Sequence, residues 1–183
     1  VLNPRAPSLY GDLRREPRRE SVSTLEAGAL ALSILEGRPD IVAPMLEPLR
    51  RLVDLDTLSD EDMVREQRAN LIDPASPNPS VETLLHAFLP HTYIDHTHAN
   101  AVLALTDQPH GELLCRQIWG DTMTLVPYVM PGFALAKAAL AAYRERPDVQ
   151  GMILLKHGVF TFGETARQAY DRMIAVVTAA EAR

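Results

Sequence analysis

The feature that most constrains the fold is an uninterrupted apolar run, Gly151-Met-Ile-Leu-Leu, which ends at Lys156 and is followed by His157-Gly158. A strand with one face in solvent alternates apolar and polar residues, whereas a strand covered on both faces is apolar throughout. The run therefore predicts a central strand that is covered on both faces.

The rest of the chain alternates between strand and helix patterns. Further strands are expected over residues 93–97, 112–118, 122–126 and 159–162. Helices are expected over about residues 25–35, 43–53, 59–70, 81–89, 99–105, 134–144 and 166–182. This alternation implies a layered α/β domain. At 183 residues, the chain is most simply one domain, residues 1–183, in which residues 1–20, with three prolines and five arginines, form an irregular arm.

Composition excludes little but sets the background. The formal net charge of −6 argues mildly against non-specific binding to nucleic acid. No apolar run reaches the length of a membrane span, and the first residues lack the pattern of a signal peptide. Cys115 is the only cysteine, so no internal disulfide can form, and a cytoplasmic location is expected. We interpret Cys115 as a small buried hydrophobe rather than a nucleophile.

Four residues have the chemistry of a metal site. His96 and His98 are spaced by two, so in a strand they lie on one side and two imidazoles can reach one ion. His157 follows the apolar run, where loops after strands often build sites. Glu82 lies in the first turn of the helix expected over 81–89. Three imidazoles and one carboxylate suit zinc, and nickel or cobalt also fit.

Each of these residues also has a plain structural explanation. Surface strands carry histidine pairs by chance, and Asp95 or Asn100 could simply hold the rings. Glu82 alone is a charge favoured at a helix start. The four residues together, in this order, are more specific. The other histidines are weaker candidates: we expect packing or turn positions for His86, His91 and His110.

A proline-rich segment precedes Glu82. Residues 73–79 hold three prolines, which predicts an extended loop. Ser80 follows as a natural N-cap of the helix over 81–89. The loop thereby delivers the Ser80 hydroxyl and the first free amides of the helix to a fixed place, and such helix starts bind anions such as phosphate.

Three motifs resemble those of the class II aldolase/adducin family: Pro-Ser-Val-Glu-Thr at 79–83, Asp-His-Thr-His-Ala at 95–99 and Leu-Lys-His-Gly at 155–158. Residues 58–64 and 73–87 resemble the aldolase portion of the bifunctional rhamnulose-1-phosphate aldolase/short-chain dehydrogenase proteins. The resemblance covers roughly residues 49–183. It implies a three-layer α/β/α sandwich with a mainly antiparallel or mixed sheet, often a homotetramer, with one zinc ion per chain near a subunit boundary.

The resemblance also implies a reaction. Zinc, held by Glu82, His96, His98 and His157, would bind two oxygens of a dihydroxyacetone-phosphate-like unit, and Ser80 would contact its phosphate. Glu82 would leave the metal and act as the base for a metal-bound enediolate. The expected substrate is a ketose 1-phosphate, most simply L-rhamnulose 1-phosphate, which is cleaved to dihydroxyacetone phosphate and an aldehyde.

The sequence departs from the family in three ways. The glycine-rich phosphate loops that precede the metal motifs in family aldolases are missing, and no Gly-x-Gly-x-x-Gly dehydrogenase motif is found. No tyrosine follows His98 at the place of the family's proton donor. Tyr128 could line the pocket, although a buried tyrosine at a strand end is simpler. An epimerase or decarboxylase of the same superfamily, or a non-catalytic adducin-like scaffold, remain alternatives.

Overall fold

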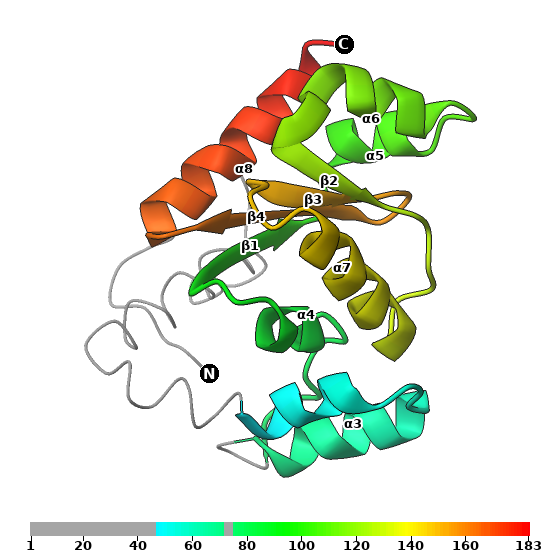
Figure 1. Ribbon diagram of the computed structural model, residues 1–183, viewed down its shortest axis with the longest axis vertical. Coiled ribbons are helices and arrows are strands. Elements are labelled where there is room, and N and C mark those ends of the chain that lie inside the picture. Colours follow the sequence, from blue (N-terminus) through cyan, green and yellow to red (C-terminus); the bar gives the residue numbers. More distant parts are fainter. Residues whose placement is uncertain (1–46, 72–74) are drawn as a thin grey trace. The chain divides into compact units, whose positions relative to one another are not determined.

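The computed structural model describes residues 47–71 and 75–183, all within one compact unit, Ala43–Arg183 (Figure 1). The expected arm over residues 1–20 and the expected helix over 25–35 lie outside the described residues. Of the helix expected over 43–53, residues 47–50 are helical and lead into a 3-10 helix, η2 (Arg51–Asp54).

The sheet has four strands, in the order β1-β4-β3-β2. Their bounds are β1 (Tyr93–Thr97), β2 (Met123–Val126), β3 (Gly151–Leu154) and β4 (Gly158–Gly163). β4 runs antiparallel to both neighbours, and β2 runs parallel to β3, so the sheet is mixed. The carboxyl ends of β1, β2 and β3 therefore share one edge, where β4 begins. β3 is central and all its residues are buried, which confirms the interpretation of the apolar run.

Helices cover both faces of the sheet (Figure 1). One layer contains α4 (Thr83–Phe88) and α7 (Phe133–Glu145), with α3 (Asp60–Ala69) adding Met63 to the same core. The other layer contains α5 (Asn100–Thr106), α6 (Gly111–Trp119) and α8 (Ala166–Glu181). A separate core cluster fills each side of the sheet: Phe160 and Phe162 face α4 and α7, whereas Ile153 and Val159 face the second layer. The three-layer α/β/α prediction is confirmed.

The strand expected over residues 112–118 is wrong, because this segment is the helix α6. Gly111, Cys115 and Trp119 are buried at a spacing of four, which is the helical period. Glu112 and Arg116 form an ion pair of 2.8 Å on the exposed side. Cys115 is fully buried, as expected, and burial raises the pKa of its thiol to about 11.

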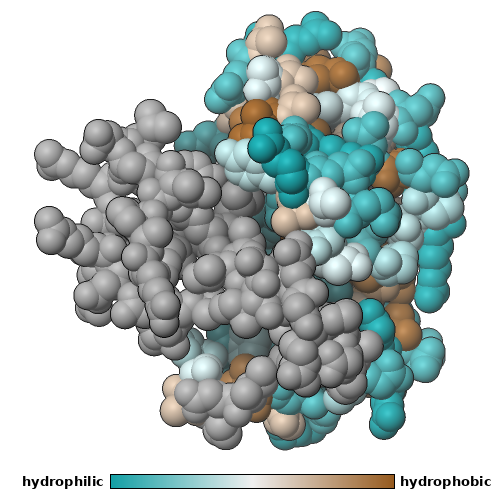
Figure 2. All heavy atoms as spheres, turned by 90° about the vertical axis from the view of Figure 1, so that its left-hand side faces the viewer, coloured by the Kyte–Doolittle hydropathy of each residue, from teal (hydrophilic) through white to brown (hydrophobic). Residues whose placement is uncertain are grey.

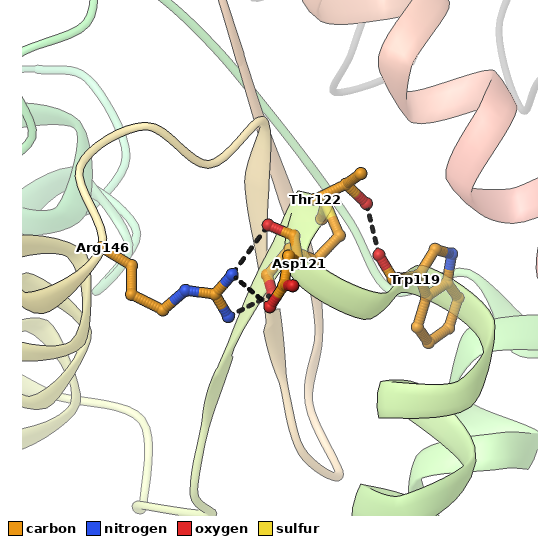
Figure 3. Close-up of polar contacts among 5 residues, drawn as sticks. Trp119, Asp121, Thr122 and Arg146 are labelled. Carbon is orange, nitrogen blue, oxygen red and sulfur yellow. Dashed lines mark hydrogen bonds and ion pairs between the residues drawn. The ribbon is translucent and has the colours of Figure 1, made fainter.

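Polar contacts anchor the start of β2 to both helical layers (Figure 3). Arg146, just after α7, donates to the carbonyl oxygen of Asp121 at 2.8 Å and pairs with its carboxylate at 3.0 Å. The hydroxyl of Thr122 donates to the carbonyl oxygen of Trp119, the last residue of α6, at 2.6 Å. The ends of α7 and α6 are thus fixed to the same edge strand.

Where Figure 2 leaves the described residues visible, hydrophobic atoms form small groups among hydrophilic ones. Among residues 47–71 and 75–183, none of the helices combines the length and apolar character that crossing a bilayer requires.

Candidate metal centre

β1 delivers two imidazoles to the sheet edge. The His96 ring stacks on Phe160 with centroids 4.0 Å apart, and its Nδ1 lies 3.0 Å from the carbonyl oxygen of Val159. Because a carbonyl oxygen can only accept, Nδ1 carries the proton and Nε2 keeps its lone pair. His98 places its own Nε2 only 2.9 Å from this nitrogen. Two nitrogens this close need a shared proton or a shared cation between them.

The turn between β3 and β4 brings His157 to the same place. The His157 amide donates to the carbonyl oxygen of Leu154 at 3.0 Å, and Lys156 has a φ of 60°, a left-handed conformation that is uncommon for residues with a side chain. The His157 ring lies 5.4 Å from the His96 ring and 4.8 Å from the His98 ring, centroid to centroid. His157 is buried, so its nitrogens are held away from bulk water.

A glycine permits this convergence. A Cβ atom on Gly158 would lie 2.6 Å from the carbonyl oxygen of Thr97, 2.9 Å from Cδ2 of His98 and 3.2 Å from Cε1 of His96. Any side chain here would push β4 away from β1 or displace both rings. The glycine of the Leu-Lys-His-Gly motif is therefore explained by the close approach of the two strands.

Glu82 reaches the histidines from the start of α4. This helix begins at Thr83, two residues later than predicted, with Glu82 as its N-cap residue. The Ser80 hydroxyl oxygen accepts from the Glu82 amide at 3.2 Å, so Ser80 shapes the preceding turn rather than capping the helix. The Glu82 carboxylate lies 3.4 Å from His157 Nε2. The hydrogen bond with His157 lowers the pKa of Glu82 to about 2 against the opposing effect of burial, so Glu82 is ionised at neutral pH.

The structure thus brings together all four residues that the sequence selected. One ligand atom each from Glu82, His96, His98 and His157 can be chosen so that all four lie within 4.8 Å of one another. Nδ1 of His157 is buried and has no hydrogen-bond partner within the described residues. The donor set, three imidazoles and one carboxylate around a common centre, fits a first-row divalent cation such as zinc.

The alternative in which Asp95 holds the histidine rings is wrong. Asp95 precedes His96 in β1, so its side chain is directed to the opposite face of the sheet. The His96 ring is held by the carbonyl oxygen of Val159 instead. Burial raises the pKa of Asp95 to about 6, a perturbation that the sequence does not reveal.

The remaining histidines pack or face solvent. His86 is half-buried and meets Phe160 edge-on at 6.0 Å, and His91 stacks on Phe162 at 4.4 Å. Burial lowers the pKa of both imidazoles. His110 is exposed, as expected. None of the three joins the metal group.

The expectation of a buried Tyr128 is wrong, because 51% of its surface is exposed. The chain leaves the sheet at Pro127, which cannot donate to a strand ladder, so the tyrosine no longer faces the core. Its hydroxyl donates to Sδ of Met130 at 3.8 Å. Tyr128 follows the carboxyl end of β2 and so lies at the sheet edge that also carries the metal group.

Comparison with known proteins identifies the family. Residues 50–183 match the family described as the Class II Aldolase and Adducin N-terminal domain, and the chain belongs to this family. A curated relative, the uncharacterized oxidoreductase YuxG of Bacillus subtilis (strain 168), is 38% identical over 136 residues, which is 74% of this chain but 20% of that protein.

A solved structure agrees with this assignment. The N-terminal class II aldolase domain of a conserved protein from Thermoplasma acidophilum is 37% identical, with a TM-score of 0.69 over 75% of this chain and 63% of that one. The chain thus spans about a fifth of the curated relative and less than two thirds of the solved chain. The family match establishes the family, and the solved structure supports the fold.

Proposed function

We propose that this chain is a metal-dependent lyase that cleaves a ketose 1-phosphate, most simply L-rhamnulose 1-phosphate, to dihydroxyacetone phosphate and an aldehyde. The observation that carries the proposal is the convergence of Glu82, His96, His98 and His157 within 4.8 Å, in a chain of the class II aldolase/adducin family. A non-catalytic scaffold has no need of such a group.

The proposed cofactor is one zinc ion per chain. His96 and His98 offer Nε2, His157 offers the nitrogen that faces Glu82, and Glu82 offers its carboxylate. When bound, a divalent ion at this place supplies Lewis-acid polarisation of a substrate carbonyl. The Val159 carbonyl fixes the tautomer of His96, which is the usual role of an outer partner of a metal ligand.

Glu82 is the proposed proton carrier. Its side chain is 17% exposed, so a substrate can reach it, and its bond to His157 keeps it ionised and weakly basic. Moving away from His157 removes this stabilisation of the carboxylate and raises its basicity. In the cleavage direction, the alcohol next to the breaking carbon–carbon bond loses its hydroxyl proton as it becomes the aldehyde. Ionised Glu82 takes up that proton and returns it to the other carbon of the broken bond. In the condensation direction, it takes that proton.

Ser80 is the proposed contact for the substrate phosphate. Ser80 is exposed, and its oxygen accepts the Glu82 amide proton, so its own hydroxyl proton stays available to a phosphate oxygen. This places anion recognition two residues from the proposed proton carrier. We further propose that the chain works as a homo-oligomer, a tetramer by family resemblance.

The test is an assay of dihydroxyacetone phosphate release from L-rhamnulose 1-phosphate by the full chain with Zn²⁺. We expect Glu82→Gln to lose activity by about 100-fold or more, because proton transfer by a positioned group contributes roughly that factor. Glu112→Gln, on the exposed side of α6, is the matched control and keeps full activity.

Three results would contradict the proposal. Cleavage that survives in Glu82→Gln would remove the proposed proton carrier. Conversion of substrate at C4 without cleavage would indicate an epimerase that uses the same residues. Absence of both bound metal and turnover in the wild-type chain would favour a scaffold.

A further inference from the structure

One buried polar side chain is not explained by the metal group or by packing. Gln67, on α3, is only 2% exposed and lies one turn after the fully buried Met63. Its Nε2 donates to the carbonyl oxygen of Ser80 at 3.2 Å. Its Oε1 is buried and has no hydrogen-bond partner within the described residues.

The position of Gln67 matters because Ser80 accepts two backbone hydrogen bonds at the start of α4. The Ser80 carbonyl oxygen also accepts from the amide of Thr83, the first residue of α4, at 3.1 Å. The Ser80 hydroxyl oxygen accepts from the amide of Glu82 at 3.2 Å. The peptide that Gln67 contacts therefore sets both the first turn of α4 and the backbone of Glu82.

α3 contacts this loop at a second place, because Arg68 donates to Oδ1 of Asn78. Arg68 and Asn78 are both exposed, so water competes for this bond. The contact between Gln67 and Ser80 is part-buried and its donor starts from inside the core, so water competes less for it.

Packing alone does not require an amide at this position. A methionine has nearly the length of glutamine and would fill the same space without burying an acceptor that lacks a partner. The glutamine costs stability through Oε1, and the only interaction it makes in return within the described residues is the bond to Ser80. The hydrogen bond to the Ser80 peptide is therefore what distinguishes glutamine from methionine at this position.

We propose that Gln67 is a positioning residue for Glu82: its amide fixes the Ser80 peptide and thereby the distance from the Glu82 carboxylate to the histidines. The inference rests on the proposed metal-dependent function and deepens it. Gln67 itself does not reach the metal group. It acts through Ser80, which lies two residues before Glu82 in the chain.

The test is the Co²⁺ affinity and visible absorption spectrum of the full chain carrying Gln67→Met. We expect about tenfold weaker Co²⁺ binding, the size of effect that outer partners of metal ligands have, and an altered absorption band. The melting temperature should not fall, because the variant lacks the buried oxygen that has no hydrogen-bond partner within residues 47–71 and 75–183. Gln108→Met is the matched control: the exposed Gln108 donates to the carbonyl oxygen of Ala104 within α5 at 2.9 Å, and we expect no change in Co²⁺ binding.

Gln67→Glu provides a second variant if Gln67→Met folds poorly. Burial favours the protonated carboxyl, which can still donate to Ser80, whereas its ionised form cannot. Relative to the wild-type chain at the same pH, Gln67→Glu should bind Co²⁺ normally at acidic pH and more weakly at alkaline pH. Because an ionised carboxylate in the core also destabilises the fold, Co²⁺ binding is compared at pH values at which the melting temperature shows that the variant is folded.

The outcomes separate the two proposals. Equal Co²⁺ affinity and spectra in the wild type, Gln67→Met and Gln67→Glu would overturn the positioning role and leave the metal-dependent function intact. A wild-type chain that binds no Co²⁺ would overturn both. Weaker binding in Gln67→Met with normal binding in Gln108→Met supports the positioning role.

Discussion

Two histidine–phenylalanine stacks lie on the same face of the sheet, but the nitrogens of the two histidine rings have different surroundings. His96 stacks on Phe160 with centroids 4.0 Å apart, and His91 stacks on Phe162 at 4.4 Å. In the first stack, Nδ1 meets a carbonyl oxygen and Nε2 faces a second imidazole. In the second, Nε2 is buried without a partner in the described part of the chain, and Tyr143 closes edge-on at 5.3 Å.

The comparison indicates that the surroundings of the ring nitrogens, rather than the residue type or the stacking, separate a candidate ligand from a packing residue. Cross-strand pairing places His96 opposite Phe160 in the ladder, at the edge where the turn to His157 arrives. His91 precedes β1 and lies at the other end of that strand, and within residues 47–71 and 75–183 it belongs to no group of three or more potential metal ligands.

The largest expected difference concerns metal binding. His96→Phe should weaken Zn²⁺ binding by about 100-fold or more, because it removes one of four ligands, whereas outer partners alone are worth roughly 10- to 100-fold. His91→Phe should leave Zn²⁺ binding unchanged. Competition titration with a chromophoric chelator measures both. Equal loss in the two variants would erase the distinction between the stacks.

A smaller difference is expected when the phenylalanines are exchanged for leucine. Phe160→Leu and Phe162→Leu should each lower the free energy of unfolding by about 1–2 kcal/mol, because both side chains are fully buried and lose ring contacts. Only Phe160→Leu should also weaken Zn²⁺ binding, by up to about tenfold, because it frees the His96 ring. Urea unfolding and metal titration test the pair. The comparison fails if Phe162→Leu weakens Zn²⁺ binding as much as Phe160→Leu does.

The smallest expected effect is on acid stability. Burial lowers the pKa of His91, Arg172 lowers it further and Glu164 partly opposes this. As pH falls below about 6.5, the unfolded chain binds a proton that folded His91 resists, so the free energy of unfolding decreases. His91→Phe keeps the stack and removes this proton uptake. Thermal unfolding at pH 7.5 and pH 5 should therefore show a smaller loss for His91→Phe than for the wild-type chain, and equal losses would refute the assignment.

Much of the architecture follows from sequence patterns, and the exceptions have physical causes. The strand over 93–97 and the apolar strand beginning at Gly151 lie where the patterns predict them. The segment 112–118 was the failure, because adjacent leucines suggest a strand while the spacing of Cys115 and Trp119 and the pair Glu112–Arg116 indicate a helix. The helical signal is present in the sequence as the spacing of four between Cys115 and Trp119 and between Glu112 and Arg116.

The candidate site, like the fold, can be predicted only in part from the sequence. Side chains with metal-binding chemistry could be selected from the sequence, because histidine spacing and strand geometry constrain them. The supporting contacts could not, since the Val159 carbonyl, the space around Gly158 and the bond from Gln67 to Ser80 join segments that are distant in the chain. Such contacts depend on the register of β1 against β4 and on the packing of α3, which no single-sequence pattern encodes.

The most direct measurement is the metal content of the full wild-type chain, purified at neutral pH without chelator and measured by elemental analysis. Convergence of the four side chains predicts about one divalent ion per chain, the usual occupancy of such a ligand set. His91→Phe should retain that ion and His96→Phe should not. A wild-type chain without metal, or a His96→Phe chain with a full complement, would contradict the assignment of this group as a metal centre.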